Sequence, residues 1–524
     1  MSILEHASLM TDEIRRVPLE ELQIRLARFR EEMEKEHPGW QMAVINNKVN
    51  MYYFTGTMQE GALVIRPQDE ILWVRRSYDR ARNESLLPDI CPMQSFRTLT
   101  EFYGACPDVM YVECRKATVD WLNMLRKYMP FKEYTDIDGL LCSLRLVKSS
   151  YELELMKRSG AIHQTVLEQL APKMIKEGIS EAELAVSLYT EMLKRGSHGI
   201  ARMNLPLGED VIGVASFGKS GLVRTAFDGP GGTGGTCIAV QSIGSPFRKL
   251  KAGRLVYLDI PCGVEGYHTD KTIVYYFGDI NKDPNHDLIL AAHEHCIMLE
   301  RFAAAMLKPG TVVEDIYNET MKQFDSRFAA GFMNGGKFLG HSIGLTMDES
   351  PAVANRFKEV LTEGMTFALE PKIALPGIGM VGSENTYLVT ANGGKALTGS
   401  PHKLLLTTGE ISIPAIIGFI SLFGIATRNG MLLISHYNTL REEGLSLRES
   451  ILHGSLDRLN PILMTALSSA LALIPLALRG DLPGNEIQSP MAKVILGGLL
   501  TSTFLNAFII PIIYEWMNRK SVRS

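Results

Sequence analysis

The stretch Leu255–Thr272, LVYLDIPCGVEGYHTDKT, decides the fold of most of the chain. Its opening residues are apolar and β-prone, two glycines mark a tight turn, and the apolar run 273–277 continues a returning strand. Asp259 ends the first strand and Asp270 begins the second. Two acids that face each other across a hairpin repel, and a bound cation would relieve that repulsion. A turn-capping role for either acid is the alternative that this stretch alone leaves open.

Three later segments add side chains of the same kind. His341 stands between glycines in FLGHSIGL, Glu370 ends the apolar run GMTFALE, and Glu384 lies in VGSENT. Together with the two aspartates they form a set of four carboxylates and one imidazole, which suits Mn²⁺, Fe²⁺, Co²⁺ or Zn²⁺. Four negative charges are too many for one structural zinc, so the set favours a two-metal site bridged by carboxylates.

In this order and these local contexts, Asp259, Asp270, His341, Glu370 and Glu384 resemble the ligands of the pita-bread metallopeptidases. That family holds Xaa-Pro aminopeptidases, prolidases, methionine aminopeptidases and creatinases, and the resemblance covers about residues 12–405. It implies an α/β (α+β) fold with a creatinase-like N-terminal domain at 1–143 and a pita-bread catalytic domain at 144–406. It also implies two divalent metal ions, a small peptide or other small-molecule substrate, and a homodimer.

The resemblance also implies a role for each side chain in metal-assisted hydrolysis of a C–N bond. Asp270 and Glu384 would bridge the two ions, Asp259 would complete the shell of one ion, and His341 that of the other. Glu370 would accept the proton of the attacking water and later donate it to the leaving group.

The chain departs from the peptidase pattern at two positions. Peptidases of this kind carry a second histidine seven residues after the metal histidine, where this chain has Asp348, and a further histidine before the first metal acid, where 241–247 contains none. Loss of such donors weakens stabilisation of the tetrahedral intermediate. The local form D-E-x-P resembles the dimethylsulfoniopropionate lyases built on this fold, in which an aspartate acts as base for β-elimination. Those lyases carry an extra acid where Pro261 stands here, and a capping role for Asp348 is a further alternative.

The composition indicates the cellular compartment of the protein and excludes some classes of partner. The chain has 524 residues, a net charge of −4 and seven scattered cysteines without a C-x-x-C pair. This length predicts two or three domains, the charge argues against a nucleic-acid partner, and the cysteines indicate reduced thiols in a cytoplasmic protein. The N-terminal residues show no apolar segment of signal-peptide length.

Hydrophobic periodicity predicts the main elements before the metal hairpin. Helices are expected at 19–36, at 150–171 behind a Ser149/Glu152 capping arrangement, and at 180–195; strand-like runs fall at 42–45, 50–56, 62–65 and 71–74. The hinge between the domains is expected at 144–152. The glycine-rich segment 229–235 lacks the Lys-Ser/Thr ending of a phosphate loop and is interpreted as a loop that lines the catalytic pocket. His286, His293 and His295 are interpreted as solvated surface histidines.

The C-terminal part changes character. Residues 411–426, 461–478 and 494–514 are uncharged and long enough, or nearly so, to cross a membrane. The segments IATRNGMLLISHYN and GDLPGNEIQSPMA resemble the last three membrane helices of heavy-metal efflux pumps of the resistance-nodulation-division family over about residues 409–518. Residues 407–524 are therefore predicted to form a three-helix transmembrane tail. Arg428 within the first span would be costly in lipid unless it is paired.

Charge around the spans predicts their orientation. The loop 441–458 carries three arginines, and Arg519, Lys520 and Arg523 follow the last span, whereas Arg479 and Lys493 lie on the other side. The positive-inside bias then puts the C-terminus in the cytoplasm and the start of the first span outside. This conflicts with a cytoplasmic enzyme domain anchored to the inner membrane, and a fusion of unrelated segments would account for the conflict. A membrane transport component, and a metal-binding scaffold without turnover, are the alternatives to an enzyme.

Overall fold

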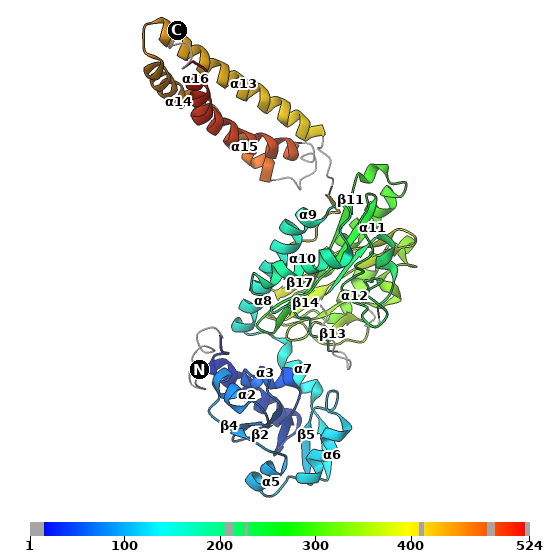
Figure 1. Ribbon diagram of the computed structural model, residues 1–524. Coiled ribbons are helices and arrows are strands. Elements are labelled where there is room, and N and C mark those ends of the chain that lie inside the picture. The colour runs from blue at the N-terminus through cyan, green and yellow to red at the C-terminus, as the bar shows by residue number, and fades with distance from the viewer. Residues whose placement is uncertain (1–14, 205–212, 226–228, 408–412, 479–487, 519–524) are drawn as a thin grey trace. The chain divides into compact units, whose positions relative to one another are not determined.

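The computed structural model describes residues 15–204, 213–225, 229–407, 413–478 and 488–518, and the chain divides into two compact units at Thr407/Thr408 (Figure 1). Arg479, Arg519, Lys520 and Arg523, which contribute to the predicted orientation of the spans, lie outside the described residues. All seven cysteines are free thiols, as their scattered spacing predicts. The three-domain division of the chain stays a prediction, and each compact unit is described by itself.

The first part of unit one is a six-stranded mixed sheet in the order β4-β3-β2-β1-β5-β6, with helices on it. Its elements are α2 (Leu19–Glu36), β1 (Ala43–Ile45), α3 (Lys48–Thr55), β2 (Gly61–Ile65), β3 (Glu70–Val74), α4 (Tyr78–Glu84), β4 (Ile90–Pro92), α5 (Arg97–Tyr103), β5 (Val109–Val112), α6 (Val119–Tyr128), β6 (Glu133–Asp136) and α7 (Asp138–Leu146). Helix α2 buries Leu22, Leu26, Phe29 and Met33, which recur at helical spacing. The predicted helix and three of the four predicted strands are confirmed.

The prediction of a strand at 50–56 is wrong, because these residues belong to helix α3 and its C-cap. The Asn47 side chain accepts a hydrogen bond from the backbone N–H of Val49 and caps the helix, and Gly56 at φ 73° ends it. Tyr53 and Phe54 are buried from this helix in the core beneath the sheet. Capping and core packing therefore outweigh the β-propensity of the aromatic residues.

Two helices of the catalytic part, α8 and α10, begin at capping residues. Both Ser149/Glu152 and Ser180/Glu183 form complete capping boxes. The helices are α8 (Ser150–His163), the π-helical segment η1 (Gln164–Leu170), α9 (Ala171–Met174), α10 (Glu181–Leu193), α11 (His286–Ala305) and α12 (Val313–Met321). Helix α7 ends at Leu146 and α8 starts at Ser150, so a helix break lies within 144–152, where a hinge between the domains stays a prediction.

The prediction that three histidines are solvated is wrong for one of them, which is buried. His293 on α11 is only 2% exposed, and its Nε2–H donates to the backbone carbonyl of His402 at 2.9 Å. His286 and His295 are partly exposed on the same helix. The amphipathic pattern placed the helix correctly but assigned His293 to the wrong face, because its carbonyl partner lies more than a hundred positions along the chain.

The catalytic sheet has nine strands, with the order β13-β12-β14-β17-β11-β8-β7 and with β18 and β19 pairing at β17 and β11. Its strands are β7 (Val214–Phe217), β8 (Arg254–Asp259), β11 (Lys271–Phe277), β12 (Phe338–Ser342), β13 (Glu349–Ala354), β14 (Thr366–Leu369), β17 (Glu384–Thr390), β18 (Gly393–Ala396) and β19 (Leu405–Thr407). Two further pairs, β9 (Cys262–Val264) with β10 (Tyr267–Thr269) and β15 (Lys372–Leu375) with β16 (Gly379–Gly382), stand beside it. The predicted hairpin is confirmed: Glu265 and Gly266 form its tip with positive φ.

Buried ion pairs tie the two parts of unit one together. Arg25 on α2 donates to Glu21 (2.9 Å), to the Tyr53 carbonyl (2.7 Å) and to the Tyr267 hydroxyl of β10 (2.9 Å), and it lies 3.5 Å from Glu152 of α8. Burial disfavours the charged guanidinium, but these partners outweigh that cost and raise the pKa of Arg25. The contacts fix the N-terminal part against the catalytic hairpin.

A second buried network runs beside the first. Arg145 on α7 donates to the Asn50 amide oxygen at 2.6 Å and to Glu349 of β13 at 2.9 Å. Asn50 in turn donates to Glu113, whose carboxylate also accepts the backbone N–H groups of residues 46 and 47. The residue before Glu349 is Asp348, so this network ends next to a predicted site residue.

Unit two consists of α13 (Ile413–Glu442), α14 (Leu447–Leu478), α15 (Gln488–Phe504), the π-helical η6 (Leu505–Ile509) and α16 (Ile510–Asn518). Three of its helical stretches are long and apolar enough to cross a membrane. Their apolar side chains mostly point outward, as with Ile420, Phe423 and Leu500, which are 67%, 72% and 77% exposed. Close helix packing uses a small residue: a Cβ on Gly498 would lie 1.9 Å from Leu422. Among the described residues none forms an ion pair with Arg428.

Candidate metal centre

Strand register gathers the predicted ligands in the middle of the catalytic sheet. Thr272 of β11 is paired with Asp259 of β8 on one side and with Glu384 of β17 on the other. His341 of β12 pairs with Ala368 of β14, two residues before Glu370. Asp270 directly precedes β11. The alternation of side chains along each strand then turns these groups toward one face.

These side chains surround one cavity of about 310 Å³. Its lining includes Asp259, Asp270, His341, Asp348 and Glu370, while Glu384 lies fully buried beside them. Gly229 and Pro230 from the glycine-rich segment also line it, which confirms the interpretation of that segment as a pocket loop. A Cβ on the neighbouring Gly231 would lie 2.3 Å from the Tyr257 hydroxyl, so the close approach of this loop requires glycine.

A lysine occupies the centre of the acidic cluster. Lys372 Nζ lies 3.0 Å from Asp259 Oδ2, 2.9 Å from Glu370 Oε2 and 2.8 Å from Glu384 Oε2, and its side chain is 1% exposed. The Tyr257 hydroxyl donates to the same Asp259 oxygen at 2.8 Å, and the Thr272 hydroxyl donates to Glu384 Oε2 at 2.8 Å. Three of the five predicted metal ligands thus already have a cation beside them, and two of the three, Asp259 and Glu384, also accept a hydroxyl hydrogen bond.

The pKa shifts follow from burial and from this lysine. Burial alone would lower the pKa of Lys372, but Asp259, Glu370 and Glu384 raise it well above its ordinary value. Burial would raise the pKa of Asp259, yet the ammonium and its hydrogen bonds hold it below the usual range. Asp270 has a pKa of about 7, raised by burial and by the charge of Asp259, and burial together with Asp270 raises the pKa of Glu384 well above normal. One ammonium therefore does not neutralise the four carboxylates.

A second region of the cluster remains open to a cation. Asp270, His341 and Glu384 each offer one ligand atom, and these atoms lie within 4.8 Å of one another. Glu384 Oε1 is buried, and none of the described residues donates a hydrogen bond to it. His341 Nδ1 is 3.0 Å from the Ser342 carbonyl, so it carries the proton and leaves Nε2 as the ligand atom. These residues fit one divalent cation.

Asp348 lies at the edge of the same cavity. Its Oδ1 accepts the backbone N–H of Asn204 at 2.6 Å, and burial raises its pKa. The residue therefore both holds a loop and faces the pocket, which agrees with the capping alternative without excluding contact with a substrate.

Sequence reasoning missed Lys372, Tyr257 and Thr272. A signal existed for the first two, because each stands two positions from a predicted acid, and Tyr257 also shares one face of β8 with Asp259. The lysine in the otherwise apolar stretch after Glu370 therefore indicates an ion pair with that acid. Thr272 depends on the pairing of β11 with β17, which residue spacing alone does not give.

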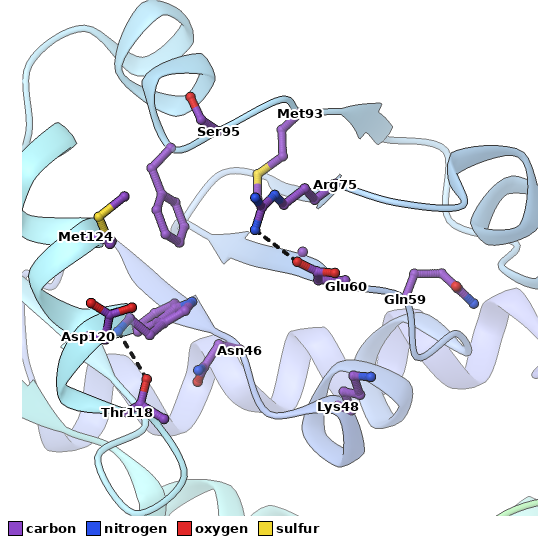
Figure 2. A pocket seen from close by; sticks show the side chains of 13 residues that line it. Asn46, Lys48, Gln59, Glu60, Arg75, Met93, Ser95, Thr118, Asp120 and Met124 are labelled. Carbon is purple, nitrogen blue, oxygen red and sulfur yellow. Dashed lines mark hydrogen bonds and ion pairs between the residues drawn. The ribbon is translucent and has the colours of Figure 1, made fainter.

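A separate cavity of about 460 Å³ lies in the N-terminal part (Figure 2). Lys48, Arg75 and Glu60 line it together with Trp121 and Met124, and Arg75 donates to Glu60 at 3.0 Å. Its lining contains none of the predicted metal ligands. The catalytic sheet, with its carboxylates and His341, therefore carries the candidate active site.

This fold and site define the N-terminal unit as a metallopeptidase-like hydrolase with the pita-bread architecture. Residues 154–391 match the profile of Metallopeptidase family M24, and residues 25–147 match that of the Creatinase/Prolidase N-terminal domain. An Xaa-Pro dipeptidase of Pyrococcus horikoshii is 25% identical over 369 residues, which is 69% of this chain and 93% of the relative. The resemblance predicted from the dispersed ligand motifs is confirmed.

Solved structures agree with the fold. The prolidase of Pyrococcus horikoshii has a TM-score of 0.60 at 23% identity, covering 73% of this chain and 99% of that one. The dipeptidase PepE of Mycobacterium ulcerans has a TM-score of 0.61 at 21% identity, covering 75% and 100%.

The tail matches a different family. Residues 388–518 match the AcrB/AcrD/AcrF family profile. A cobalt-zinc-cadmium resistance protein of Cupriavidus metallidurans is 42% identical over 125 residues, which is 24% of this chain. The chain spans only about 12% of the length of this curated efflux relative. The predicted resemblance of the tail to an efflux pump is confirmed at that extent.

Proposed function

We propose that the N-terminal unit is a metal-dependent hydrolase that cleaves a peptide or related C–N bond, with Xaa-Pro dipeptides as the first substrate class. The observation that carries the proposal is the convergence of Asp270, His341 and Glu370 on one cavity. The profile match and the printed names of the dipeptidase and prolidase relatives support the choice of substrate.

The side chains divide the work as follows. Asp270, His341 and Glu384 would hold a divalent ion, whose chemistry is to lower the pKa of a bound water and to polarise a carbonyl. Glu370 lines the cavity, with Oε2 held by Lys372 and Oε1 3.5 Å from His341 Nε2. It would accept a proton from the attacking water and return it to the leaving nitrogen. The two-ion arrangement of Asp259, Asp270, His341, Glu370 and Glu384 remains the prediction that the resemblance implies.

The test is hydrolysis of Ala-Pro by the purified full chain in detergent, supplied with Mn²⁺ or Co²⁺, with release of proline as the readout. Glu370→Gln should lower kcat by about 10²–10⁴-fold because it removes the proton acceptor. Arg158→Ala, which changes an exposed ion pair with Glu265, is the matched control and should retain activity. Absence of proline release with metal bound would contradict the proposal.

A second candidate is β-elimination with Asp348 as the base. The position of Asp348 on the cavity wall favours it, since a C–H proton of a bound small molecule would lie within reach. Release of acrylate from dimethylsulfoniopropionate, lost in Asp348→Asn, would support this reading over peptide hydrolysis.

We place the enzyme unit in the cytoplasm as a homodimer and the tail in the inner membrane. The free thiols and the three apolar helices support this placement. The alternative, a fragment of a transport system, is favoured only by the tail. Light scattering of the detergent-solubilised chain tests the dimer, and protease accessibility in spheroplasts tests the side of the membrane.

A further inference from the structure

We propose that Lys372 is a built-in cation that takes the place of one of the two divalent ions, so that the site binds a single ion at Asp270, His341 and Glu384. This inference concerns the same site and rests on the proposed function only for the presence of one catalytic ion. It assigns to this chain a metal stoichiometry of one.

The first argument is that the ammonium is saturated. A lysine ammonium has three N–H donors, and Lys372 Nζ lies within hydrogen-bond distance of three carboxylates, at 2.8, 2.9 and 3.0 Å. These carboxylates come from the end of β8, from the residue after β14, and from the start of β17. A divalent ion that used Asp259 Oδ2 as its ligand would have to displace both the ammonium and the Tyr257 hydroxyl from that oxygen.

The second argument is that the fold makes room for the lysine. Lys372 pairs with Gly382 across β15 and β16, and a Cβ on Gly382 would lie 2.6 Å from Lys372 Cγ. The stem of the lysine therefore lies over a position without a side chain, and the residue is 1% exposed. The ammonium is held at the cluster by its surroundings as well as by charge.

The third argument is that one cation position is left. Asp270 makes no contact with Lys372 among the ion pairs of the described residues, and Glu384 keeps Oε1 without a donor. The His341 Nε2 atom completes the set of three ligand atoms. One divalent ion and one ammonium bring three positive charges to four carboxylates, and a second divalent ion beside the ammonium would meet strong repulsion.

The experiment measures metal content and electronic coupling in the full chain purified in detergent. The chain is stripped with chelator, loaded with Mn²⁺ and studied by elemental analysis and electron paramagnetic resonance. We expect one Mn²⁺ per chain and the six-line spectrum of an isolated ion. Lys372→Gly should bind two ions and show the multiline spectrum of a coupled pair. Lys148→Met, which removes another buried lysine whose partner is Glu349, is the control and should stay at one ion.

Each outcome bears on the assignment. Two ions or a coupled spectrum in the unmodified chain overturn it, as does the absence of any bound ion. A folded Lys372→Gly chain that still binds one ion also overturns it. If Lys372→Gly does not fold, the stoichiometry and spectrum of the unmodified chain decide. Failure of Ala-Pro hydrolysis would refute the proposed function and leave the stoichiometry measurement intact.

Discussion

Replacing Arg25 by alanine should strongly destabilise the N-terminal unit. Arg25 is 1% exposed, and its removal leaves Glu21 and Glu152 without their shared cation. Breaking a buried ion pair from one side costs about 3–5 kcal/mol. Each carboxylate keeps one hydrogen-bond donor in the variant, since Tyr267 donates to Glu152 at 2.7 Å and Ser149 donates to Glu21 at 2.8 Å. The variant also loses the stacking of the guanidinium 4.4 Å from the Tyr53 ring centre.

Protonation sets an upper limit on the electrostatic part of this loss. A buried carboxylate left without a cation takes up a proton, and at pH 7 that costs about 1.36 kcal/mol for each of the roughly 2.7 pH units above an ordinary glutamate pKa of about 4.3. The limit for each of the two carboxylates is therefore about 3.7 kcal/mol at pH 7 and about 1 kcal/mol at pH 5. Because the folded variant binds the extra proton and the unfolded chain does not, the loss shrinks as pH falls.

The assay is urea unfolding of residues 1–407, followed by the fluorescence of Trp40, Trp73 and Trp121, which all lie in the N-terminal part. Arg158→Ala is the matched control, because its ion pair with Glu265 at 3.2 Å is made by a side chain that is 44% exposed. The control should lose less than about 1 kcal/mol. Equal losses for the two variants, or a loss at Arg25 that does not shrink between pH 7 and pH 5, would refute the reasoning.

Three further predictions follow from the described contacts. Between pH 7 and pH 5 the His293→Gln variant should lose about 2 kcal/mol less stability than the wild type. Burial lowers the pKa of His293 to about 4, whereas the unfolded histidine binds a proton below about 6.5, so protonation favours the unfolded wild type as pH falls. Urea unfolding at both pH values checks this. Gly340→Ala should cost about 1–3 kcal/mol by the same assay, because its Cβ would lie 1.9 Å from the Ala368 carbonyl oxygen, whereas Gly139→Ala, with open space around it, should not. A chain that stops after Thr407 should stay in the supernatant on ultracentrifugation, while the full chain pellets with membranes. A chain that stops after Leu404 should be less stable than one that stops after Thr407, because it lacks strand β19, which pairs with β11.

Much of the catalytic site could be predicted because strand ends and glycine contexts fix where acids point. Asp259, Asp270, Glu370 and Glu384 lie at or next to the ends of apolar strands, His341 lies near the end of β12, and the sheet brings these positions together. The hairpin turn and the Ser149/Glu152 capping box are local features, so the sequence predicts them directly.

What could not be predicted depends on distant pairing. The helix over 48–55 is decided by a cap at Asn47 and by burial of Phe54, which outweigh the β-propensity of its aromatic residues. The burial of His293 depends on a carbonyl 109 positions away in sequence. Lys372 becomes a partner of Asp259 only because β15 lies beside the end of β8, and residue types alone give no measure of that distance.

The link from Glu113 through Asn50 and Arg145 to Glu349 has a consequence for anyone who recombines this protein with its relatives. The N-terminal and catalytic segments look modular, since separate family profiles describe them, yet four polar groups on both sides of the junction satisfy one another in the interior. A shuffled gene that joins the first segment of one homologue to the second of another would take Asn50, Glu113 and Arg145 from one parent and Glu349 from the other. Productive hybrids should therefore be those in which all four residues come from the same parent or match between the parents.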